Sequence, residues 1–298
     1  MKPVVITRLM GGLGNQMFQY AAGRSLSEKF HVPLLLDRSF LDKRGENLTH
    51  TIRDLEIDAW QINASIATQE EITRLERVDR NPFLRRIAAR VPSLIHNRIF
   101  RAASTKYNPA FEKARPPVLL DGFWQSEKYF KNIRPLLLRE FQPVDKPEGR
   151  NVELLSQISS SNSISIHVRR GDYVTNPGAS RFHGACSIDY YERAAARMKG
   201  ISTNPLFFIF SDELEWVKEN IQLPSNTVFV SHNKGRESYW DLFLMRNCRH
   251  HIIANSSFSW WGAWLGEFPG KKVMAPGNWF SDPLADASDI VPPEWLRL

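Results

Sequence analysis

Short apolar runs alternate with amphipathic stretches over most of the chain. Residues 3–9 (PVVITRL) and 33–37 (PLLLD) have the continuous apolar character of buried strands. Between them, residues 15–30 repeat apolar side chains at helical spacing. The predicted stripe of this helix consists of Met17, Phe18, Ala21, Ala22, Leu26 and Phe30. The chain is therefore expected to begin with a strand, a helix and a second strand.

The middle of the chain is less regular. From about Leu41 to Ala114 it is polar and rich in arginine, with helical patterns at 67–78 and 81–91. A strand-like stretch at 118–124 (VLLDGFW) and a helical one at 127–141 follow. Residues 141–150 (FQPVDKPEGR) contain two prolines, one glycine and no apolar period, which indicates a linker between domains.

The second half alternates regularly between the two patterns. Strands are predicted at 163–168, 205–211, 227–231, 250–255 and 271–276, with helical segments between them. Such alternation predicts a mostly parallel sheet covered on both faces. We therefore expect an α/β protein of two Rossmann-like domains, residues 1–145 and 146–298, with ligands at the carboxyl ends of the strands, in the crevice between the halves.

Composition narrows the class of protein. The 298 residues are 42% hydrophobic and 24% charged, as in ordinary globular domains. No apolar run approaches the roughly 20 residues of a membrane span, and the N-terminus is a poor signal peptide. Cys186 and Cys248 form neither a disulfide framework nor a CxxC pair, which favours a reducing, cytoplasmic location.

The formal net charge of +7 has a local source. Between Arg74 and Arg115 there are eleven Lys or Arg and three Asp or Glu. Residues 83–103 mix Arg with Phe, Leu and Ile at near-helical spacing. This pattern fits a solvated basic surface or a segment, within 75–115, that contacts anionic membrane lipids; it is too apolar for a simple nucleic-acid patch.

The motif HVRRGDY follows a predicted strand and places His167, Arg169, Arg170 and Asp172 together. Successive strand side chains point to opposite faces, so one arginine is expected to face the ligand side, unless the backbone turns at Gly171. Arginine suits bidentate binding of phosphate. The simpler alternative is an Arg–Asp turn that only stabilises the loop.

Three further stretches carry candidate chemistry. In HHIIANSSFSWWGAWL, Ser256 and Ser257 begin a helix, which indicates either an anion site or a plain serine cap. Asp241 lies within the apolar helix YWDLFLM and needs a partner, either the helix start or the N–H edge of a guanine. Asp212 follows a strand, where a ribose hydroxyl, a loop N–H or a helix cap is the usual partner.

The stretch GGLGNQ, between a predicted strand and helix, suggests a dinucleotide phosphate loop, with Asp37 as the acidic residue after the next strand. The motif GxGxxG is not satisfied, because Met17 occupies the place of the third glycine. The chain also lacks Asp-x-Asp, HExxH, GxxxxGK[ST] and GxSxG motifs. What remains is a nucleotide diphosphate site made by arginine, serine and helix ends, with no metal.

In this order, these stretches resemble the bacterial α-1,2-fucosyltransferases of glycosyltransferase family 11. The resemblance rests on GGLGNQMFQYAAG, DGFWQSEKYF, SIHVRRGDY, FSDELEW, YWDLFLM and IIANSSFSWWGAWL. It implies a GT-B fold, with two Rossmann-like domains facing across a cleft. The N-terminal domain, with an arginine-rich helical insertion, would be on the acceptor side, and the C-terminal domain would hold most of GDP-fucose. It also implies inverting transfer of L-fucose from GDP-fucose to the 2-hydroxyl of a galactose in a glycan, such as an O-antigen unit, without a metal or other cofactor.

The resemblance also implies roles for individual residues. Arg169 would hold the β-phosphate beside His167, with Arg170 and Asp212 in the same site, and Asp241 would pair with guanine. The diphosphate would be covered by Ser256, Ser257 and Phe258.

On the N-terminal side, Gly12 and Gly14 would let the backbone approach the donor. Asn15 and Gln16 would orient hydroxyls of fucose or acceptor.

Two questions stay open at this level. Inversion calls for a base, and Asp172 is the nearest carboxylate, although a salt bridge with Arg170 or proton uptake by the departing phosphate serves equally well. The competing functions are a fucosyltransferase of another linkage or acceptor, a nucleotide-dependent oxidoreductase and a non-catalytic nucleotide-sugar-binding module.

Overall fold

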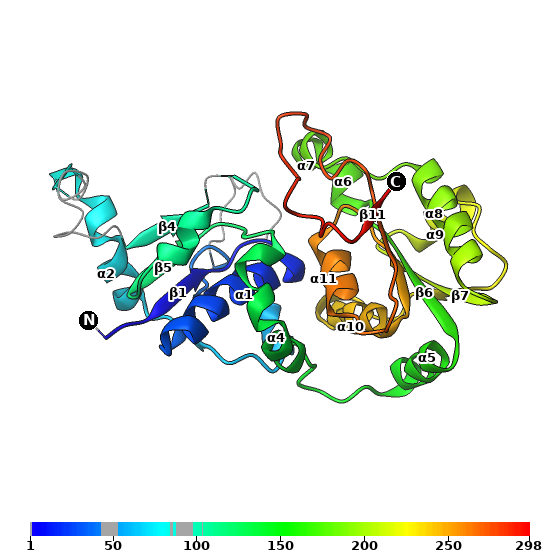
Figure 1. The fold of residues 1–298 in the computed structure, drawn as a ribbon, viewed down its shortest axis with the longest axis horizontal. Helices are drawn as coiled ribbons and strands as arrows, with labels where there is room; N and C mark the ends of the chain where they lie inside the picture. The colour runs from blue at the N-terminus through cyan, green and yellow to red at the C-terminus, as the bar shows by residue number, and fades with distance from the viewer. Residues whose placement is uncertain (1, 43–52, 84–85, 88–97, 103) are drawn as a thin grey trace. The chain divides into compact units, whose positions relative to one another are not determined.

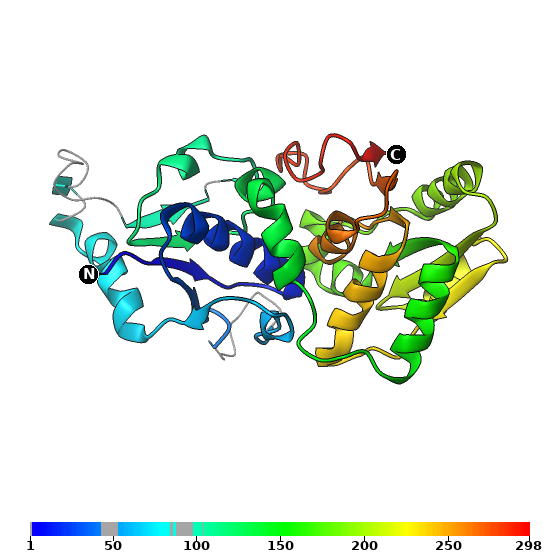
Figure 2. The same ribbon diagram turned by 60° about the horizontal axis from the view of Figure 1, so that its bottom comes forward.

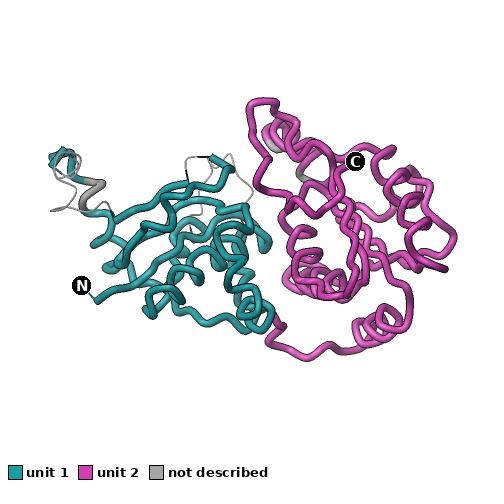
Figure 3. Tube along the Cα trace, in the orientation of Figure 1, with its two compact units in different colours: residues 1–141 teal, residues 142–298 magenta. Residues whose placement is uncertain are grey.

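The chain folds into two compact α/β units, described from a computed structural model that covers residues 2–42, 53–83, 86–87, 98–102 and 104–298. Unit 1 comprises Met1–Phe141 and unit 2 comprises Gln142–Leu298 (Figure 3). The division therefore falls at the start of the stretch 141–150. None of the described helices is long and apolar enough to cross a membrane.

In unit 1, the described residues form a sheet of five parallel strands in the order β3-β2-β1-β5-β4. The strands are β1 (Val5–Arg8), β2 (Leu34–Asp37), β3 (Ser65–Ile66), β4 (Ile99–Arg101) and β5 (Val118–Asp121). The helices are α1 (Leu13–Phe30), α2 (Gln69–Arg80) and α4 (Arg134–Glu140). Short 3₁₀ segments are η1 (Ile57–Ala59), η2 (Pro109–Lys113), η3 (Glu127–Tyr129) and η4 (Lys131–Ile133).

Helices cover both faces of this sheet (Figures 1 and 2). Ile6 of β1 packs with Ile72 and Leu75 of α2. Thr7 points to the opposite face, where its hydroxyl donates to the Gln19 carbonyl of α1 at 3.1 Å. The alternation along β1 thus assigns α2 and α1 to opposite faces.

Unit 2 contains six parallel strands among its described residues, in the order β11-β10-β9-β6-β7-β8. The strands are β6 (Asn162–Val168), β7 (Pro205–Ser211), β8 (Thr227–Val230), β9 (His250–Ile252), β10 (Val273–Ala275) and β11 (Leu296–Arg297). The helices are α5 (Gly149–Ser160), α6 (Gly171–Thr175), α7 (Pro177–Phe182), α8 (Ile188–Ile201), α9 (Leu214–Asn220), α10 (Tyr239–Asn247) and α11 (Ser257–Leu265), with the 3₁₀ segment η5 (Gly235–Ser238).

The core of unit 2 follows the alternation within SISIHV. Ile164, Ile166 and Val168 pack into the cluster that also contains Tyr191 of α8 and Val217 of α9. Ser163, Ser165 and His167 point to the other face and are also buried. Helix α11 packs over this second face through Phe258, whose ring centroid lies 5.6 Å from that of His167. The polar side chains of β6 are therefore buried as deeply as the apolar ones.

The α/β class and the parallel sheets expected from the sequence are confirmed, with local differences. Helix α1 does not bury a single stripe: the polar residues Gln16, Gln19 and Arg24 are buried as well as the apolar ones. The expected helix at 127–141 is split into η3, η4 and α4, because Pro135 fits the first turn of a helix but not its interior.

The arginine-rich middle also differs from its predicted form. Most of residues 83–103 lie outside the described residues, but Ile99–Arg101 is strand β4 and not part of a helix. It pairs with β5, and Ile99 is buried in the core of unit 1. Pairing with a distant strand has overridden the local apolar spacing.

Candidate active site

The candidate site of unit 2 lies where its strand order reverses. Numbered along the chain, the six strands follow the order 6-5-4-1-2-3, which is that of the dinucleotide-binding folds. The connections diverge between β6 and β9, and ligands of such sheets bind beyond the carboxyl ends of the strands at that point. The motifs HVRRGDY and NSSF follow β6 and β9 respectively.

Arg169 is held at the exit of β6 by a carboxylate from the neighbouring strand. Its Nη1 lies 2.9 Å from Oδ2 of Asp212, and its side chain is one-quarter exposed. The other oxygen of Asp212 accepts the backbone N–H of Arg170 at 3.0 Å. Of the partners considered for Asp212, the structure thus provides the loop N–H, together with Arg169.

Gly171 is required by the position of that carboxylate. A Cβ at residue 171 would lie 2.4 Å from Oδ2 of Asp212, well inside contact distance. The turn after Arg170 therefore tolerates only glycine as long as Asp212 holds Arg169.

Arg170 points to a different partner from that of Arg169, and its place among the diphosphate-binding residues stays a prediction. Its Nε donates to Oε2 of Glu213 at 3.0 Å, and its guanidinium lies 3.5 Å from the ring centroid of Trp216. Arg170 thus fastens the β6 exit to the start of α9. Its carboxylate partner among the described side chains is Glu213.

Asp172 itself is described only in its backbone, which lies in α6. Its side chain lies outside the described part of the structure, so its role as a base stays a prediction. The next residue, Tyr173, donates its hydroxyl to the Asn255 carbonyl at 3.2 Å. This bond ties the loop after β6 to the loop after β9.

His167 lies between the arginine and α11. It is 6% exposed, and its Nδ1 has no hydrogen-bond partner among the described residues. Burial, with a smaller effect of the Arg169 charge, lowers the pKa of His167 to about 3. The ring is therefore neutral near pH 7, and its buried Nδ1 is the kind of orphan polar atom that a ligand can satisfy.

The start of α11 carries the expected serine cap. The Ser256 hydroxyl accepts the Phe258 N–H at 3.3 Å, while Ser257 and Phe258 are half-buried. The preceding Asn255 is buried, and its amide donates to three backbone carbonyls, those of His183, Gly184 and Trp279. The loop from β9 to α11 is thus rigid, and Asn255, which the sequence placed only at a strand end, is the residue that fixes it.

Asp241, in the first turn of α10, is a carboxylate whose ionised form is disfavoured by burial. Its Oδ1 accepts from Nδ2 of Asn233 at 2.8 Å, and Asn233 also exchanges a pair of hydrogen bonds with Asn151 of α5. Burial raises the pKa of Asp241 to about 7, and the Asn233 bond offsets only part of that effect. A ligand that presents N–H donors would relieve this cost.

Asn233 was not among the predicted site residues. The signal that points to it is its place in TVFVSHN, three residues after the end of strand β8.

In unit 1, the loop GGLGNQ is held mainly by its own side chains. The Gln16 amide donates to the carbonyls of Gly11 and Asp54, and its oxygen accepts the N–H groups of Glu56 and Ile57. Gln16 is fully buried. Its expected role in orienting sugar hydroxyls is therefore wrong for this structure, because all its hydrogen-bonding capacity is used.

The three glycines of this loop differ in what they do. Gly11 has a φ of +74°, which requires glycine. Gly12 precedes α1 in extended backbone, and Gly14 lies buried in its first turn. Asn15 is half-buried and accepts from Nε2 of Gln125 at 2.7 Å.

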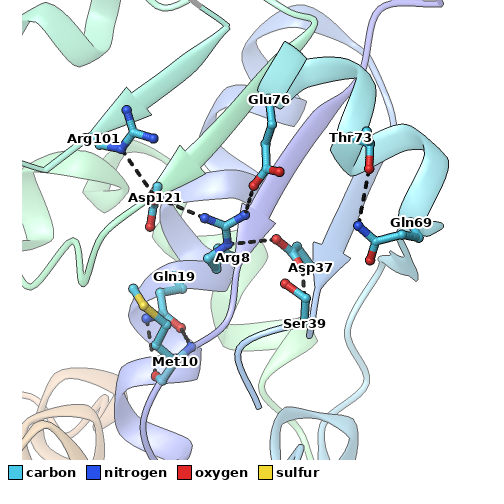
Figure 4. A network of polar contacts seen from close by, with 10 residues as sticks. All are labelled: Arg8, Met10, Gln19, Asp37, Ser39, Gln69, Thr73, Glu76, Arg101 and Asp121. Atoms are coloured by element: carbon cyan, nitrogen blue, oxygen red, sulfur yellow. Dashed lines mark hydrogen bonds and ion pairs between the residues drawn. The ribbon is translucent and has the colours of Figure 1, made fainter. Parts of the chain in front are cut away.

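Two contacts in unit 1 argue against a dinucleotide site at the loop GGLGNQ. The Leu13 N–H at the start of α1, where a pyrophosphate would bind, already donates to Oε2 of Glu56 at 2.6 Å. The Asp37 carboxylate is fully buried and bound to Nε of Arg8 and to the Ser39 N–H (Figure 4). Neither the helix start nor the acidic residue is available to a dinucleotide.

Comparison with known proteins agrees with these features. Residues 101–298 match the family model described as Glycosyl transferase family 11. An α-1,2-colitosyltransferase of Escherichia coli is 34% identical, covering 99% of both chains. The O-antigen biosynthesis glycosyltransferase WbnK of Escherichia coli is 32% identical, covering 97% of this chain and 99% of that protein.

More distant relatives share part of the sequence or only the fold. The human galactoside α-(1,2)-fucosyltransferase 1 is 29% identical over 161 residues, which is 51% of this chain and 44% of that protein. Among solved structures, the α-1,6-fucosyltransferase NodZ of Bradyrhizobium, co-crystallised with GDP, superposes with a TM-score of 0.52 at 14% identity. The match covers 89% of this chain and 93% of that one, and it shows the shared fold.

Proposed function

This chain belongs to glycosyl transferase family 11, and we propose that it is a galactoside 2-α-L-fucosyltransferase. It takes L-fucose from GDP-fucose and transfers it, with inversion and without a metal, to the 2-hydroxyl of a galactose in a glycan. The observation that carries this proposal is the grouping of Arg169, His167 and the Ser256-capped start of α11 at the switch point of unit 2.

The donor diphosphate is assigned to this group of residues. As the bond between fucose and the β-phosphate breaks, negative charge grows on the phosphate oxygens. A guanidinium held in place by Asp212 stabilises that charge without reorganising, which lowers the barrier of the reaction. The N–H groups at the start of α11, with the hydroxyls of Ser256 and Ser257, act on the same charge.

The guanine base is assigned to Asp241. Guanine presents N1–H and an exocyclic amino group side by side, and a carboxylate accepts from both. Because Asp241 is costly to ionise when no ligand is bound, a base with two donors gains most from pairing with it. Adenine lacks this donor pair, so the same contact selects the nucleotide.

The acceptor proton has two possible destinations in this proposal. Asp172 is close in sequence to Arg169 and could act as the base, or the departing β-phosphate could take the proton. A pH profile of Asp172→Asn separates them: loss of the acidic limb supports the carboxylate, and a retained limb assigns the proton to the phosphate.

A second donor is supported by the similarity to the α-1,2-colitosyltransferase. Colitose is L-fucose without the 3-hydroxyl, so a site built around GDP and a 6-deoxy sugar admits both donors. Parallel assays with GDP-fucose and GDP-colitose, using one galactoside acceptor, decide between them by the ratio of kcat/KM.

The test of the proposed function is product formation by the purified chain. With GDP-fucose, a β-galactoside and EDTA, we expect GDP release and a product whose new linkage is α-1,2 by NMR. Thermal shift assays should show stabilisation by GDP without magnesium and none by NAD. Stabilisation by NAD alone would favour an oxidoreductase, and GDP binding without transfer would favour a binding module.

We also propose that the chain acts in the cytoplasm, where residues 75–115 contact anionic lipid at the membrane surface. The support is the excess of eleven basic over three acidic residues between Arg74 and Arg115. Co-sedimentation with vesicles of anionic and of neutral lipid tests this. Binding to the anionic vesicles that weakens with salt is expected, and no binding at low salt rejects the membrane contact.

A further inference from the structure

Residues 122–126, which follow β5, form a fixed loop at the carboxyl edge of the unit 1 sheet. Trp124 in its centre is 2% exposed, although its φ of +55° lies in the left-handed region. Its ring packs against those of Phe100, Phe111 and Tyr129, with centroids 5.3–5.8 Å away. A bulky residue keeps such a backbone conformation only where its surroundings impose it, and such conformations cluster at functional sites.

The start of this loop is held by charge. Arg8 at the end of β1 binds Asp37, Glu76 and Asp121 through separate nitrogens, at 2.8, 2.7 and 3.1 Å (Figure 4). Asp121 also lies 3.5 Å from Nε of Arg101 at the end of β4. Arg8 thus joins the ends of β1, β2 and β5 with α2, and it fixes the point from which the loop departs.

The side chains before and after Trp124 are less buried than its ring. Phe123 is 45% exposed, which is unusual for a phenylalanine in a rigid loop. Gln125 reaches the neighbouring loop, where its Nε2 donates to Oδ1 of Asn15 at 2.7 Å. Asn15 in turn lies over Gly11, since a Cβ on Gly11 would be 2.6 Å from Nδ2 of Asn15.

The bond between the two amides determines what they still offer. With its oxygen used by Gln125, Asn15 presents the N–H groups of Nδ2, while Gln125 presents Oε1. Neither group has a hydrogen-bond partner within the described ranges, and both side chains are half-buried. A donor and an acceptor side by side match two neighbouring sugar hydroxyls, and an exposed aromatic ring matches the C–H face of a galactose.

We propose that Asn15, Phe123 and Gln125 form the subsite for the acceptor galactose. Phe123 packs under the apolar face of the sugar, and the amide pair binds two adjacent hydroxyls. This inference rests on the proposed function and names the residues of unit 1 that hold the acceptor.

The charges nearby favour the acceptor over the donor. The N–H of Leu13 at the start of α1 is occupied by Glu56, and the Arg8 guanidinium is neutralised by three carboxylates. This edge is therefore suited to a neutral sugar and poorly suited to a diphosphate.

Steady-state kinetics with a soluble β-galactoside test the subsite. For Phe123→Ala and for Gln125→Leu, we expect the acceptor KM to rise about 10-fold, the effect of one lost sugar contact. The KM for GDP-fucose and the Kd for GDP should not change. Phe123→Tyr should restore the acceptor KM, and Ile66→Ala, at an apolar residue of β3 that is exposed to the same extent, is the matched control.

A direct binding measurement separates this inference from the proposed function. Saturation-transfer NMR with methyl β-galactoside should show binding to the unaltered chain and none to Phe123→Ala, with GDP-induced thermal stabilisation equal in both. Transfer by the unaltered chain with an unchanged acceptor KM in both variants overturns the subsite alone. Absence of transfer by the unaltered chain overturns the proposed function, and absence of a galactoside signal as well overturns both.

Discussion

Neighbouring residues of one motif have separate tasks in this protein. Arg169 and Arg170 are adjacent, yet the first is held by Asp212 at the switch point and the second is bound to Glu213 and Trp216. Only the first is in a position to act on the donor phosphate in the proposed reaction. The residue scale therefore provides the sharpest tests of the donor site.

Arg169→Lys tests the guanidinium. A lysine keeps the charge but cannot bind Asp212 and phosphate together, so we expect kcat to fall about 10²–10³-fold. The measurement is steady-state transfer from GDP-fucose. Arg193→Lys on the exposed face of α8 is the control, and a kcat for Arg169→Lys equal to that of this control would remove Arg169 from catalysis.

Asp241 predicts a pH dependence of stability. The folded-state pKa is raised from 3.8 to about 7, so between these values the folded chain holds a proton that the unfolded chain has lost. Stability from this group is therefore fully present below about pH 4 and is lost as the pH rises through 7. In urea unfolding, the free energy of unfolding of Asp241→Asn should not decrease over this pH range. At pH 8 it should be higher than that of the unaltered chain.

The raised pKa of Asp241 also predicts that the affinity for GDP rises with pH, whereas the stability from this group falls. Guanine pairs with the ionised carboxylate, whose population falls about tenfold from pH 8 to pH 6. Calorimetry should show the GDP affinity falling by the same factor as the pH is lowered. Asp241→Asn should bind GDP weakly at both values and no longer prefer it to ADP; an unchanged preference would contradict the assignment.

At the scale of elements, buried side-chain amides hold the backbone of the loops that follow the strands. Gln16 and Gln19 both fasten the loop between β1 and α1, the latter through the N–H and carbonyl of Met10. Asn255 does the same for the loop between β9 and α11. The motifs are specific because several of their polar residues are committed to the backbone.

Gln16→Leu tests this at the level of an element. It leaves four backbone groups, one of them buried and three partly buried, without their partner, and we expect the free energy of unfolding to fall by about 3 kcal/mol. Gln157→Leu on the exposed side of α5 is the control and should unfold like the unaltered chain. Equal denaturation midpoints for the two variants would show that the Gln16 bonds contribute little.

The whole molecule consists of two units that each contain a complete parallel sheet. The side chains proposed to bind the donor all belong to unit 2, and the proposed acceptor subsite belongs to unit 1. The two substrates are thus assigned to separate cores.

Hydrogen exchange tests that division. GDP should slow amide exchange in residues 167–173 and 255–258 of unit 2, where it covers backbone N–H groups. The acceptor galactoside should instead protect residues 121–126 of unit 1. Protection of 121–126 by GDP in the absence of acceptor would contradict the division.

Much of this arrangement was predictable from the sequence, because the relevant signals are local. Apolar runs and helical spacing indicated two parallel α/β units, and the place of HVRRGDY and NSSF after strands indicated the edge where they meet. Met17 in place of a glycine argued against a dinucleotide site. Strand ends and helix starts are properties of a few consecutive residues, so a single sequence carries them.

The tertiary structure decided which polar residues are available to a ligand. Arg170 and Glu213 are 43 residues apart, and Asn15 and Gln125 are 110 residues apart, so neither pairing is visible in a local pattern. Gln16, Asp37 and Arg170 looked like candidates for binding and form hydrogen bonds within the fold, whereas the partners of Asn233 and Gln125 are seen only in the folded chain. A side chain's hydrogen-bonding capacity is limited, and only folding determines how much of it remains for a substrate.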